Sequence, residues 1–301
     1  MANFPTLRQL RHLVALAETR HFGRAALACH VTQSTLSVSI RSLEETLGAP
    51  LFDRNRRKIA FTPLGDEIVA RAQRILLDTE DLVQAARAAR EPLGGTIRMG
   101  VIPTIGPFLL PSMFRRLRKA YPKLRLLLRE DRTDRLLALL EAGELDVLIL
   151  ALPCAHGGAK VQPLFTDKFV VAFAAGHRLE AKSTVRAADL AGENVLLLNE
   201  GHCLREHALA ACQGTRTAQS ESFAATSLHT LVQMIDGGVG VTLLPAIAVA
   251  AGIVRGTNVV TRPLTGGDNS RQIGLAWRAH ARRRSEYELL GRELKALLER
   301  G

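Results

Sequence analysis

The sequence has little cysteine and no segment suited to a membrane or to export. Four cysteines are scattered through 301 residues, which does not suit a structural disulfide framework, so we expect them to be reduced, as in the cytosol. No basic-then-apolar leader follows Met1, and the longest apolar stretch, Val239–Val254, is interrupted by Thr242, Pro245 and Gly252. We therefore expect a cytoplasmic protein with no membrane partner.

The signatures of common enzymes and cofactor sites are also missing. The sequence holds no Gly-rich nucleotide loop, no CxxC pair and no HExxH motif. We therefore expect neither an enzyme nor a cofactor, although turnover by a thiol peroxidase or a Cys–His hydrolase is an alternative. We also expect no metal, although Cys203 and His207 are one helical turn apart, with His202 and Cys212 nearby, and could share one.

Acidic residues are outnumbered by basic ones. The chain has 40 Lys and Arg against 29 Asp and Glu, a net charge of +11, which favours a polyanionic partner. Residues 1–62 hold nine basic and four acidic residues, an excess typical of segments that bind nucleic acid. A generally basic surface is the alternative, because the rest of the chain is basic too.

Residues 6–50 carry a helical pattern interrupted by one tight turn. Leu36, Ile40, Leu43 and Leu47 mark one face of a helix that Gly48 ends. Two helices joined by a tight turn, the second with a hydroxyl-rich outer face, predict a helix-turn-helix. Base contacts are expected from the leading end of the second helix, at Thr32, Gln33, Ser34, Thr35 and Ser37. Gln33 is the strongest of these, since Gln can bridge two groups on adenine.

A basic turn follows the helix-turn-helix. Residues 54–58 lie between the short apolar runs 51–52 and 59–61, a pattern typical of a two-stranded wing with a basic tip. Phosphate is its natural counterion, and phosphate contacts set affinity rather than specificity. Such contacts are expected from Arg41, Arg54, Arg56, Arg57 and Lys58. Solvated surface charge is the alternative for the wing.

Residues 63–91 are predicted to form one long helix, with Thr62 as its cap and Pro63 in its first turn. Apolar and small residues on it step alternately by four and three, which makes a heptad seam. The seam residues are Ile68, Ala72, Ile75, Thr79, Leu82 and Ala86. The seam predicts packing against a second copy of the chain, and packing within its own domain is the alternative.

From Thr96 onward, short apolar runs alternate with helical stretches. Helices are expected at 107–120, 133–142, 203–211, 226–236 and 285–299. The alternation predicts parallel sheets covered by helices, in two small α/β subdomains.

The segment EGHCLREHALAAC, residues 200–212, places two cysteines nine positions apart on one predicted helix. Nine helical residues span about 13 Å, whereas a disulfide requires Cα atoms within about 7 Å. Cys203 and Cys212 can therefore bond only if the segment unravels, which would make it a two-state element. Cys203 lies where the helix would begin, close to His202 and Arg205, so we expect a lowered pKa for its thiol.

A family resemblance rests on these same segments. FGRAALACHVTQSTLSVSIRSLEETLGAPLFDR resembles the DNA-binding segment of LysR-type transcriptional regulators. GVIPTIGPFLLP, GHCLREHALAAC and ATSLHTLVQMIDGGVGVTLLP resemble the peroxide-sensing OxyR branch of that family, and the likeness covers essentially the whole chain in the same order. Ser34 and Ser39 depart from residues common in the family, so the preferred DNA sequence cannot be carried over.

The resemblance implies a fold class of α/β with three parts. These are an all-α winged helix-turn-helix at 1–62, a dimerisation linker helix at 63–91 and a regulatory domain at 92–301 similar to periplasmic binding proteins. Its subdomain I is expected at 95–166 and 268–301, and its subdomain II at 167–267. The resemblance further implies a nucleoid-associated tetramer, a dimer of dimers, with promoter DNA, RNA polymerase and a cellular thiol reductant as partners.

The resemblance also implies the signal, which is hydrogen peroxide. Cys203 would be oxidised to a sulfenic acid and Cys212 would resolve it to a disulfide, altering DNA binding to control oxidative-stress genes. The residues that match peroxide-binding or thiolate-activating positions are Thr104, Thr133, His202, Arg205 and Arg271. A LysR-type regulator that binds a small organic effector in the subdomain cleft, with incidental cysteines, is the alternative.

Overall fold

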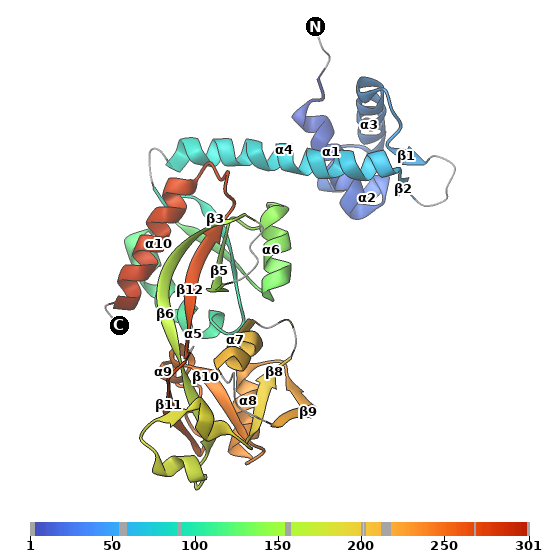
Figure 1. Ribbon diagram of the computed structural model, residues 1–301. Coiled ribbons are helices and arrows are strands. Elements are labelled where there is room, and N and C mark those ends of the chain that lie inside the picture. The colour runs from blue at the N-terminus through green and yellow to red at the C-terminus, as the bar shows by residue number, and fades with distance from the viewer. Residues whose placement is uncertain are drawn as a thin grey trace. The chain divides into compact units, whose positions relative to one another are not determined.

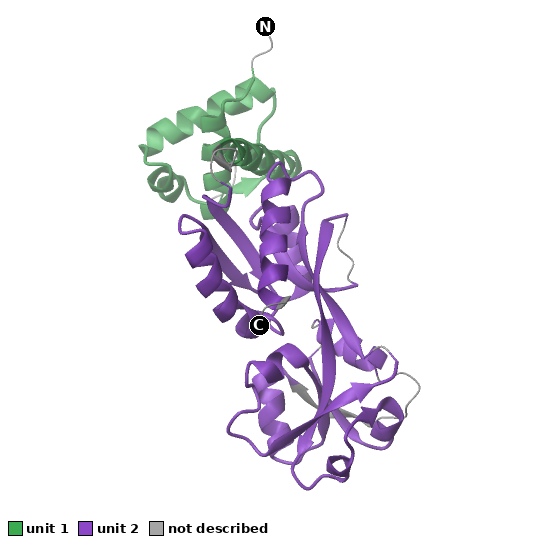
Figure 2. Cartoon of the chain, turned by 90° about the vertical axis from the view of Figure 1, so that its left-hand side faces the viewer, with its two compact units in different colours: residues 1–86 green, residues 87–301 purple. Residues whose placement is uncertain are grey.

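The computed structural model describes residues 4–53, 59–88, 92–153, 158–199, 201, 203–211, 218–267 and 269–299. The chain divides into two compact units, residues 1–86 and residues 87–301 (Figure 2). Among the residues described, no helix is both long enough and apolar enough to cross a membrane.

The first unit is helical and carries one short hairpin. Its elements are α1 (Leu7–Thr19), α2 (Phe22–Ala28), α3 (Gln33–Leu47), β1 (Phe52–Asp53), β2 (Ala60–Phe61) and α4 (Pro63–Ala88). The side chains of Thr6, His21 and Thr32 cap the first three helices, and Gly48, at φ 70°, ends α3. β1 pairs antiparallel with β2. The structure therefore confirms the winged helix-turn-helix.

The core of the first unit also takes in the start of α4. Leu13, Leu16 and Leu36 pack between the three short helices, and Ile68 and Ala72 of α4 pack against the same cluster. Ala72 is only 1% exposed. The predicted seam is thus wrong at Ala72, which its own unit covers, whereas Ile68 is only half-buried by that unit.

The second unit is built on a sheet with helices around it (Figure 1). Its strands are β3 (Thr96–Val101), β4 (Arg125–Glu130), β5 (Val147–Leu152), β6 (Lys160–Ala174), β7 (Val185–Arg186), β8 (Asn194–Leu198), β9 (Ala218–Ala225), β10 (Val241–Pro245), β11 (Val259–Thr265) and β12 (Ser270–Trp277). Its α-helices are α5 (Gly106–Ala120), α6 (Thr133–Glu141), α7 (Cys203–Ala211), α8 (Leu228–Asp236), α9 (Ala246–Ala250) and α10 (Arg284–Glu299). Short 3-10 turns lie at Arg178–Ala181 and Ala187–Leu190.

The sheet is mixed, which corrects the prediction of parallel sheets. β3 pairs parallel with β4 and β5, and β8 pairs parallel with β9 and β10. β6, however, runs antiparallel to β12, β10 and β11, and β12 runs antiparallel to β5. Alternating strands and helices predict the parallel neighbours, but they do not reveal strands that run back between two halves of a sheet.

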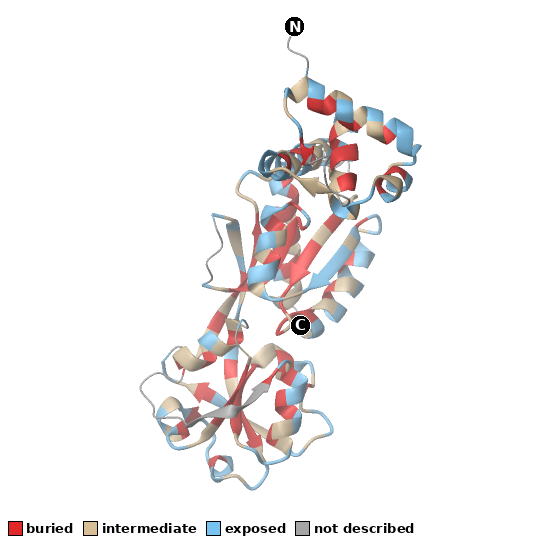
Figure 3. Cartoon of the chain, turned by 90° about the vertical axis from the view of Figure 1, so that its right-hand side faces the viewer, coloured by how far each residue is buried: buried red, intermediate tan, exposed pale blue. Residues whose placement is uncertain are grey.

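Two separate cores flank the long strand β6. One gathers side chains of β3, β5, β12, α5, α6 and α10, and we call this half lobe I. The other gathers side chains of β8, β10, α7 and α8, and we call it lobe II. β6 contributes Leu164 to the first core and Phe169 to the second, so it connects the lobes. Buried residues are concentrated on the strands that cross each lobe (Figure 3).

Candidate functional site

Cys203 is the first residue of α7, on the boundary between the two lobes. Leu204, Ala208 and Ala211 of the same helix are buried in the core of lobe II. Cys203 itself packs against the core of lobe I. The turn before it contains Gly201 at φ 86°, a left-handed conformation that favours glycine. The thiol therefore lies where lobe II meets lobe I, on a helix whose buried face belongs to lobe II.

Arg271 of β12 brings a buried positive charge to this boundary. Its side chain is fully buried, and Nη1 donates to Thr104 Oγ1 at 2.8 Å while Nη2 donates to the Thr104 carbonyl at 3.1 Å. Thr104 follows β3 and is 2% exposed. Burial raises the pKa of the Cys203 thiol, and the positive charge of Arg271 opposes that rise. Arg271 and Thr104 thus lie together, from segments 167 positions apart, and the charge of Arg271 reaches Cys203.

Thr133, the first residue of α6, offers a hydroxyl to the same place. Its Oγ1 is buried and has no hydrogen-bonding partner of good geometry in the described part of the chain. The nearness of this hydroxyl to Cys203 also opposes the rise in the pKa of the thiol that burial causes. A buried hydroxyl with unused hydrogen-bonding capacity is costly unless a small polar molecule satisfies it. The site is therefore suited to such a ligand.

Burial outweighs these effects on the thiol. Loss of solvent raises the pKa of Cys203 above its ordinary value, and the charge of Glu206 adds to the rise, against the lowering by Arg271 and Thr133. The expectation of a lowered pKa, drawn from the helix start, is therefore wrong. A raised pKa leaves less thiolate at neutral pH but makes that thiolate intrinsically more nucleophilic.

Alkylation of Cys203 should follow this raised pKa. Since only the thiolate reacts, we expect its reaction with iodoacetamide to keep accelerating above about pH 8.5, the ordinary cysteine pKa. Mass spectrometry resolved by peptide gives the rate at each pH, and the same peptide in urea gives the reference. A native profile displaced to lower pH than the denatured one would contradict the expectation.

Arg205, another predicted site residue, is hydrogen-bonded to the neighbouring strand. Arg205 donates through Nη1 to the Leu198 carbonyl at 3.3 Å, so it holds the end of β8. His202 and Cys212 lie outside the described residues. The structure therefore brings Thr133 and the charge of Arg271 close to Cys203, ties Thr104 to Arg271, and bonds Arg205 to the end of β8.

The helix α3 presents most of the predicted base-reading residues to solvent. Gln33, Ser34 and Thr35 are exposed, and Ser37 is half-buried. Thr32 is partly used within the fold, because its hydroxyl accepts from the Thr35 backbone N–H at 3.2 Å. Arg41 is exposed, whereas the wing residues 54–58 lie outside the described residues.

Two further positions on α3 change the predicted DNA-reading face. Ser39 is hydrogen-bonded to Nδ1 of the buried His12 at 2.7 Å, so it faces α1 rather than a groove. Val38, which periodicity does not single out, is 64% exposed and is suited to contact a thymine methyl group.

Comparisons with known proteins agree with this architecture. Residues 7–66 match the model of the bacterial regulatory helix-turn-helix protein, lysR family, and residues 90–299 match the LysR substrate binding domain. The chain is 41% identical to the DNA-binding transcriptional dual regulator OxyR of Escherichia coli K12, over 97% of this chain and 96% of that protein. The chain belongs to the OxyR branch of the LysR family.

Solved structures place this LysR-type regulator among the same relatives. A full-length OxyR variant from Pseudomonas aeruginosa matches with a TM-score of 0.77 and 36% identity, covering 97% of this chain and 95% of that one. An OxyR mutant of Corynebacterium glutamicum, solved with hydrogen peroxide bound, matches with a TM-score of 0.69 and 32% identity, covering 100% and 94%. The regulator EstR of Acinetobacter baylyi is 38% identical over 96% of each chain. The family consists of transcriptional regulators rather than enzymes.

Two residues of the regulator's site are absent from the peroxide-site residues that the sequence predicts. Asp167 of β6 is buried and accepts from Arg271 Nε at 3.1 Å and Nη2 at 3.0 Å. His207 lies one turn after Cys203; burial and the charge of Arg271 lower its pKa, and its Nδ1 is buried without a partner among the described residues. The spacing of His207 is visible in the sequence, whereas nothing marks Asp167. Among the described residues, no three His, Cys, Asp or Glu side chains gather as a metal site.

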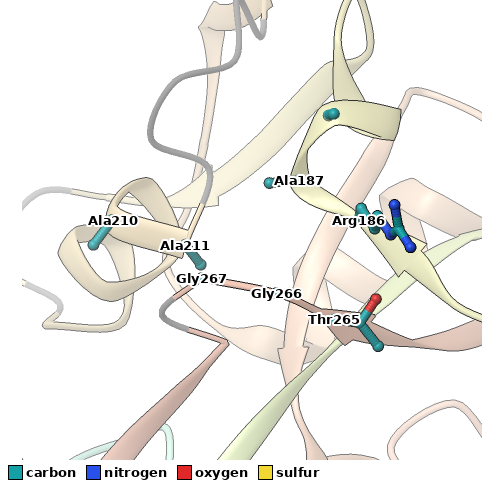
Figure 4. Close-up of a pocket in the computed structure, with 8 residues that line it drawn as sticks. Arg186, Ala187, Ala210, Ala211, Thr265, Gly266 and Gly267 are labelled. Atoms are coloured by element: carbon teal, nitrogen blue, oxygen red, sulfur yellow. The ribbon is translucent and has the colours of Figure 1, made fainter.

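A cavity of about 430 Å³ lies at the other end of α7 (Figure 4). Its walls are Arg186, Ala187, Ala188, Ala210, Ala211, Thr265, Gly266 and Gly267. All of these residues belong to the predicted subdomain II, so the cavity is not the inter-subdomain cleft of the organic-effector alternative.

Proposed function

We propose that this chain is a DNA-binding regulator that senses hydrogen peroxide through oxidation of Cys203. The observation that carries the proposal is that Cys203 lies close to the buried Thr133 hydroxyl and within reach of the charge of the buried Arg271 guanidinium. The names of the relatives support it, since several are hydrogen peroxide-inducible genes activators. An organic effector is the alternative, and no described feature favours it.

The reaction consumes one peroxide molecule for each disulfide. The Cys203 thiolate attacks one peroxide oxygen, the O–O bond breaks and hydroxide leaves, taking up a proton to become water. Sulfur is thereby oxidised by two electrons to a sulfenic acid. The Cys212 thiolate then attacks that sulfur, the S–S bond forms, and the S–O bond breaks to release a second hydroxide, which is also protonated to water. A cellular thiol reductant would return both cysteines to thiols.

Because burial leaves only a small fraction of Cys203 as thiolate, the protein environment must accelerate the reaction of that thiolate with peroxide. Arg271 and Thr104 together present positive charge and a hydroxyl, and Thr133 presents a second hydroxyl. Fixed donors of this kind stabilise charge that develops on a leaving oxygen. They also hold a small polar molecule close to the sulfur, which lowers the entropic part of the barrier.

Disulfide formation would be coupled to a change in α7. The helix runs from Cys203 to Ala211, eight residue steps or about 12 Å of axial rise, and Cys212 is the next residue. Its Cα must come within about 7 Å of that of Cys203, so helical turns must open. Leu204 and Ala208 would then leave the core of lobe II, and exposing the leucine alone costs about 1.5–3 kcal/mol. The covalent bond opposes that cost, which links redox state to conformation.

Mass spectrometry of peroxide-treated protein tests the proposal. Treatment with micromolar hydrogen peroxide should produce a peptide pair linked through Cys203 and Cys212. The absence of both this link and an oxygen adduct on Cys203 would reject the peroxide mechanism. In that event, screening small organic acids for an effect on operator binding becomes the test of the effector alternative.

The proposed output is a change in how the regulator binds promoter DNA. Gln33, Ser34, Thr35 and Ser37 are proposed to contact bases, and Thr32 to orient them as the cap of α3. α4 is proposed to pair with its copy in a second chain, and two dimers to form a tetramer. RNA polymerase is the proposed downstream partner, in the nucleoid region of the cytoplasm.

The wing should govern the salt dependence of DNA binding. Replacing Arg54, Arg56, Arg57 and Lys58 by Gln removes four proposed phosphate contacts. We expect the slope of log K against log salt to become shallower by about 3–4, since each contact contributes about 0.9. Fluorescence anisotropy at salt concentrations between about 50 and 200 mM measures it.

A charge-matched variant controls for the loss of positive charge in general. Arg115, Arg118, Lys119 and Arg125 are exposed basic residues of the second unit. Their replacement by Gln lowers the net charge equally and should change the slope much less. Equal changes in both variants would show that general charge, and not the wing, sets the affinity.

A further inference from the structure

The Arg271 side chain is held by a carboxylate directly opposite it in the sheet. Arg271 of β12 and Asp167 of β6 are cross-strand partners. Asp167 Oδ2 accepts from Arg271 Nε at 3.1 Å and from Nη2 at 3.0 Å, and both side chains are at most 1% exposed. A buried guanidinium requires such a partner, because an unpaired buried charge is strongly destabilising. Asp167 therefore keeps Arg271 inside the protein.

The hydrogen bonds of Arg271 leave one N–H for another molecule. A guanidinium has five N–H groups. The single Nε–H and both Nη2 hydrogens are used by Asp167 and by the Thr104 carbonyl, and one Nη1 hydrogen is used by Thr104 Oγ1. The second Nη1–H has no acceptor among the described residues. The fixed orientation of the guanidinium therefore sets the position of this remaining N–H donor.

Asp167 also connects the two lobes at this point. Its other oxygen, Oδ1, accepts from the Ile247 backbone N–H of α9 at 3.1 Å. Through Arg271 the same carboxylate is connected to Thr104 of lobe I. Both oxygens are therefore engaged, and the carboxylate has little freedom to rotate away from the guanidinium.

We propose that Asp167 is a positioning residue for the reaction of Cys203 with peroxide. It orients the Arg271 guanidinium so that its remaining Nη1–H can bind the peroxide oxygen that leaves as hydroxide. The inference deepens the proposed function and rests on it. The oxidant is hydrogen peroxide, the bond that breaks is O–O, and Asp167 itself neither gains nor loses a proton or an electron.

The experiment compares two reactions of the same thiol. The rate constant of Cys203 with hydrogen peroxide is divided by its rate constant with iodoacetamide at the same pH, in the full-length chain. The quotient cancels the thiolate fraction and the accessibility of the sulfur, and it retains the acceleration that is specific to peroxide. We expect Asp167→Asn to lower the quotient about 100-fold, since small displacements of a catalytic group have effects of this size.

The conservative variant separates positioning from simple support of the fold. Asp167→Glu keeps a carboxylate opposite Arg271 and should retain most of the quotient. A residue that only stabilised the fold would change both rate constants together and leave the quotient unchanged in Asp167→Asn. That unchanged quotient would overturn the inference. If the wild-type quotient itself equals that of a small free thiol, the proposed function fails instead.

A second pair of variants includes one, the double variant, in which neither buried charge is left unpaired. Arg271→Gln removes the guanidinium, and the double variant Asp167→Asn with Arg271→Gln removes both charges. If Asp167 acts through Arg271, the two chains should have the same quotient, as a double-mutant cycle requires of residues that act as one unit. A further loss in the double variant would show that Asp167 acts by another route and would contradict the proposal.

Discussion

Cys203→Ser should abolish the response to hydrogen peroxide. The wild-type chain is expected to lose two thiols on treatment with micromolar peroxide, and the serine variant none. The reason is that a serine hydroxyl is not ionised near neutral pH and cannot be oxidised along the thiol series. Thiol titration before and after treatment measures the change, and operator binding of the variant should be the same with and without peroxide.

Matched variants of the other cysteines show which thiols take part in the reaction. Cys212→Ser should lose one thiol rather than two, and a sulfenic acid on Cys203 should then be trapped by dimedone. Cys29→Ser should behave as wild type, since Cys29 packs against the core of the first unit and burial raises the pKa of its thiol. Loss of two thiols from Cys203→Ser would assign the chemistry to other cysteines and end the proposal.

The surroundings of Cys203 explain why a serine at this position should retain no part of the response to peroxide. The environment does not act as a general activator of nucleophiles, because burial raises the pKa of the thiol despite the nearby Arg271. A neutral thiol still ionises to some extent at neutral pH, whereas a buried alcohol does not. The donors at the site can therefore assist only a sulfur nucleophile, and the expected effect is complete rather than graded.

The features that the sequence predicts well are those set by neighbours along the chain. The helix-turn-helix follows from the spacing of Leu36, Ile40 and Leu43 and from two local caps, Thr32 and Gly48, all within one short segment. The sequence predicts α7 with its observed bounds for the same reason. Such signals depend on periodicity and capping, which need no knowledge of the rest of the fold.

The features that the sequence does not reveal depend on contacts between distant segments. Asp167 and Arg271 are 104 positions apart, and only the antiparallel pairing of β6 with β12 places them opposite each other. The predicted pKa of Cys203 is wrong because the helix start is visible in the sequence while burial against lobe I is not. The prediction for Ala72 is wrong because a heptad position can pack either against a second chain or against its own unit. Ala72 packs against its own unit.

Substitutions on the exposed half of α4 should have the second large effect, which is on dimer formation. Ile75 and Leu82 are 45% and 55% exposed and lie seven positions apart, on the same face of the helix. Large apolar side chains left exposed at this spacing indicate a surface that a second chain covers. We therefore expect the double variant Ile75→Glu, Leu82→Glu to dissociate the proposed dimer.

The size of this effect follows from the area lost. Four side chains per dimer would be removed from the interface, and at about 1 kcal/mol each for half-buried groups the dimer loses about 4 kcal/mol. Its dissociation constant should rise about 1,000-fold. Operator affinity should fall with it, because a dimer binds two half-sites at once. Analytical ultracentrifugation and anisotropy titrations measure the two quantities.

A control variant tests whether the position on α4, rather than the added negative charge, causes the dimer to dissociate. Gln73 and Val83 are exposed on α4 but lie outside the predicted seam, so Gln73→Glu, Val83→Glu adds the same number of carboxylates elsewhere. This chain should stay dimeric. The seam variant should keep the thermal stability of the first unit, because neither Ile75 nor Leu82 belongs to its core cluster. If the control dissociates and the seam variant does not, α4 pairs through a different face, and the correction already required at Ala72 extends to the whole seam.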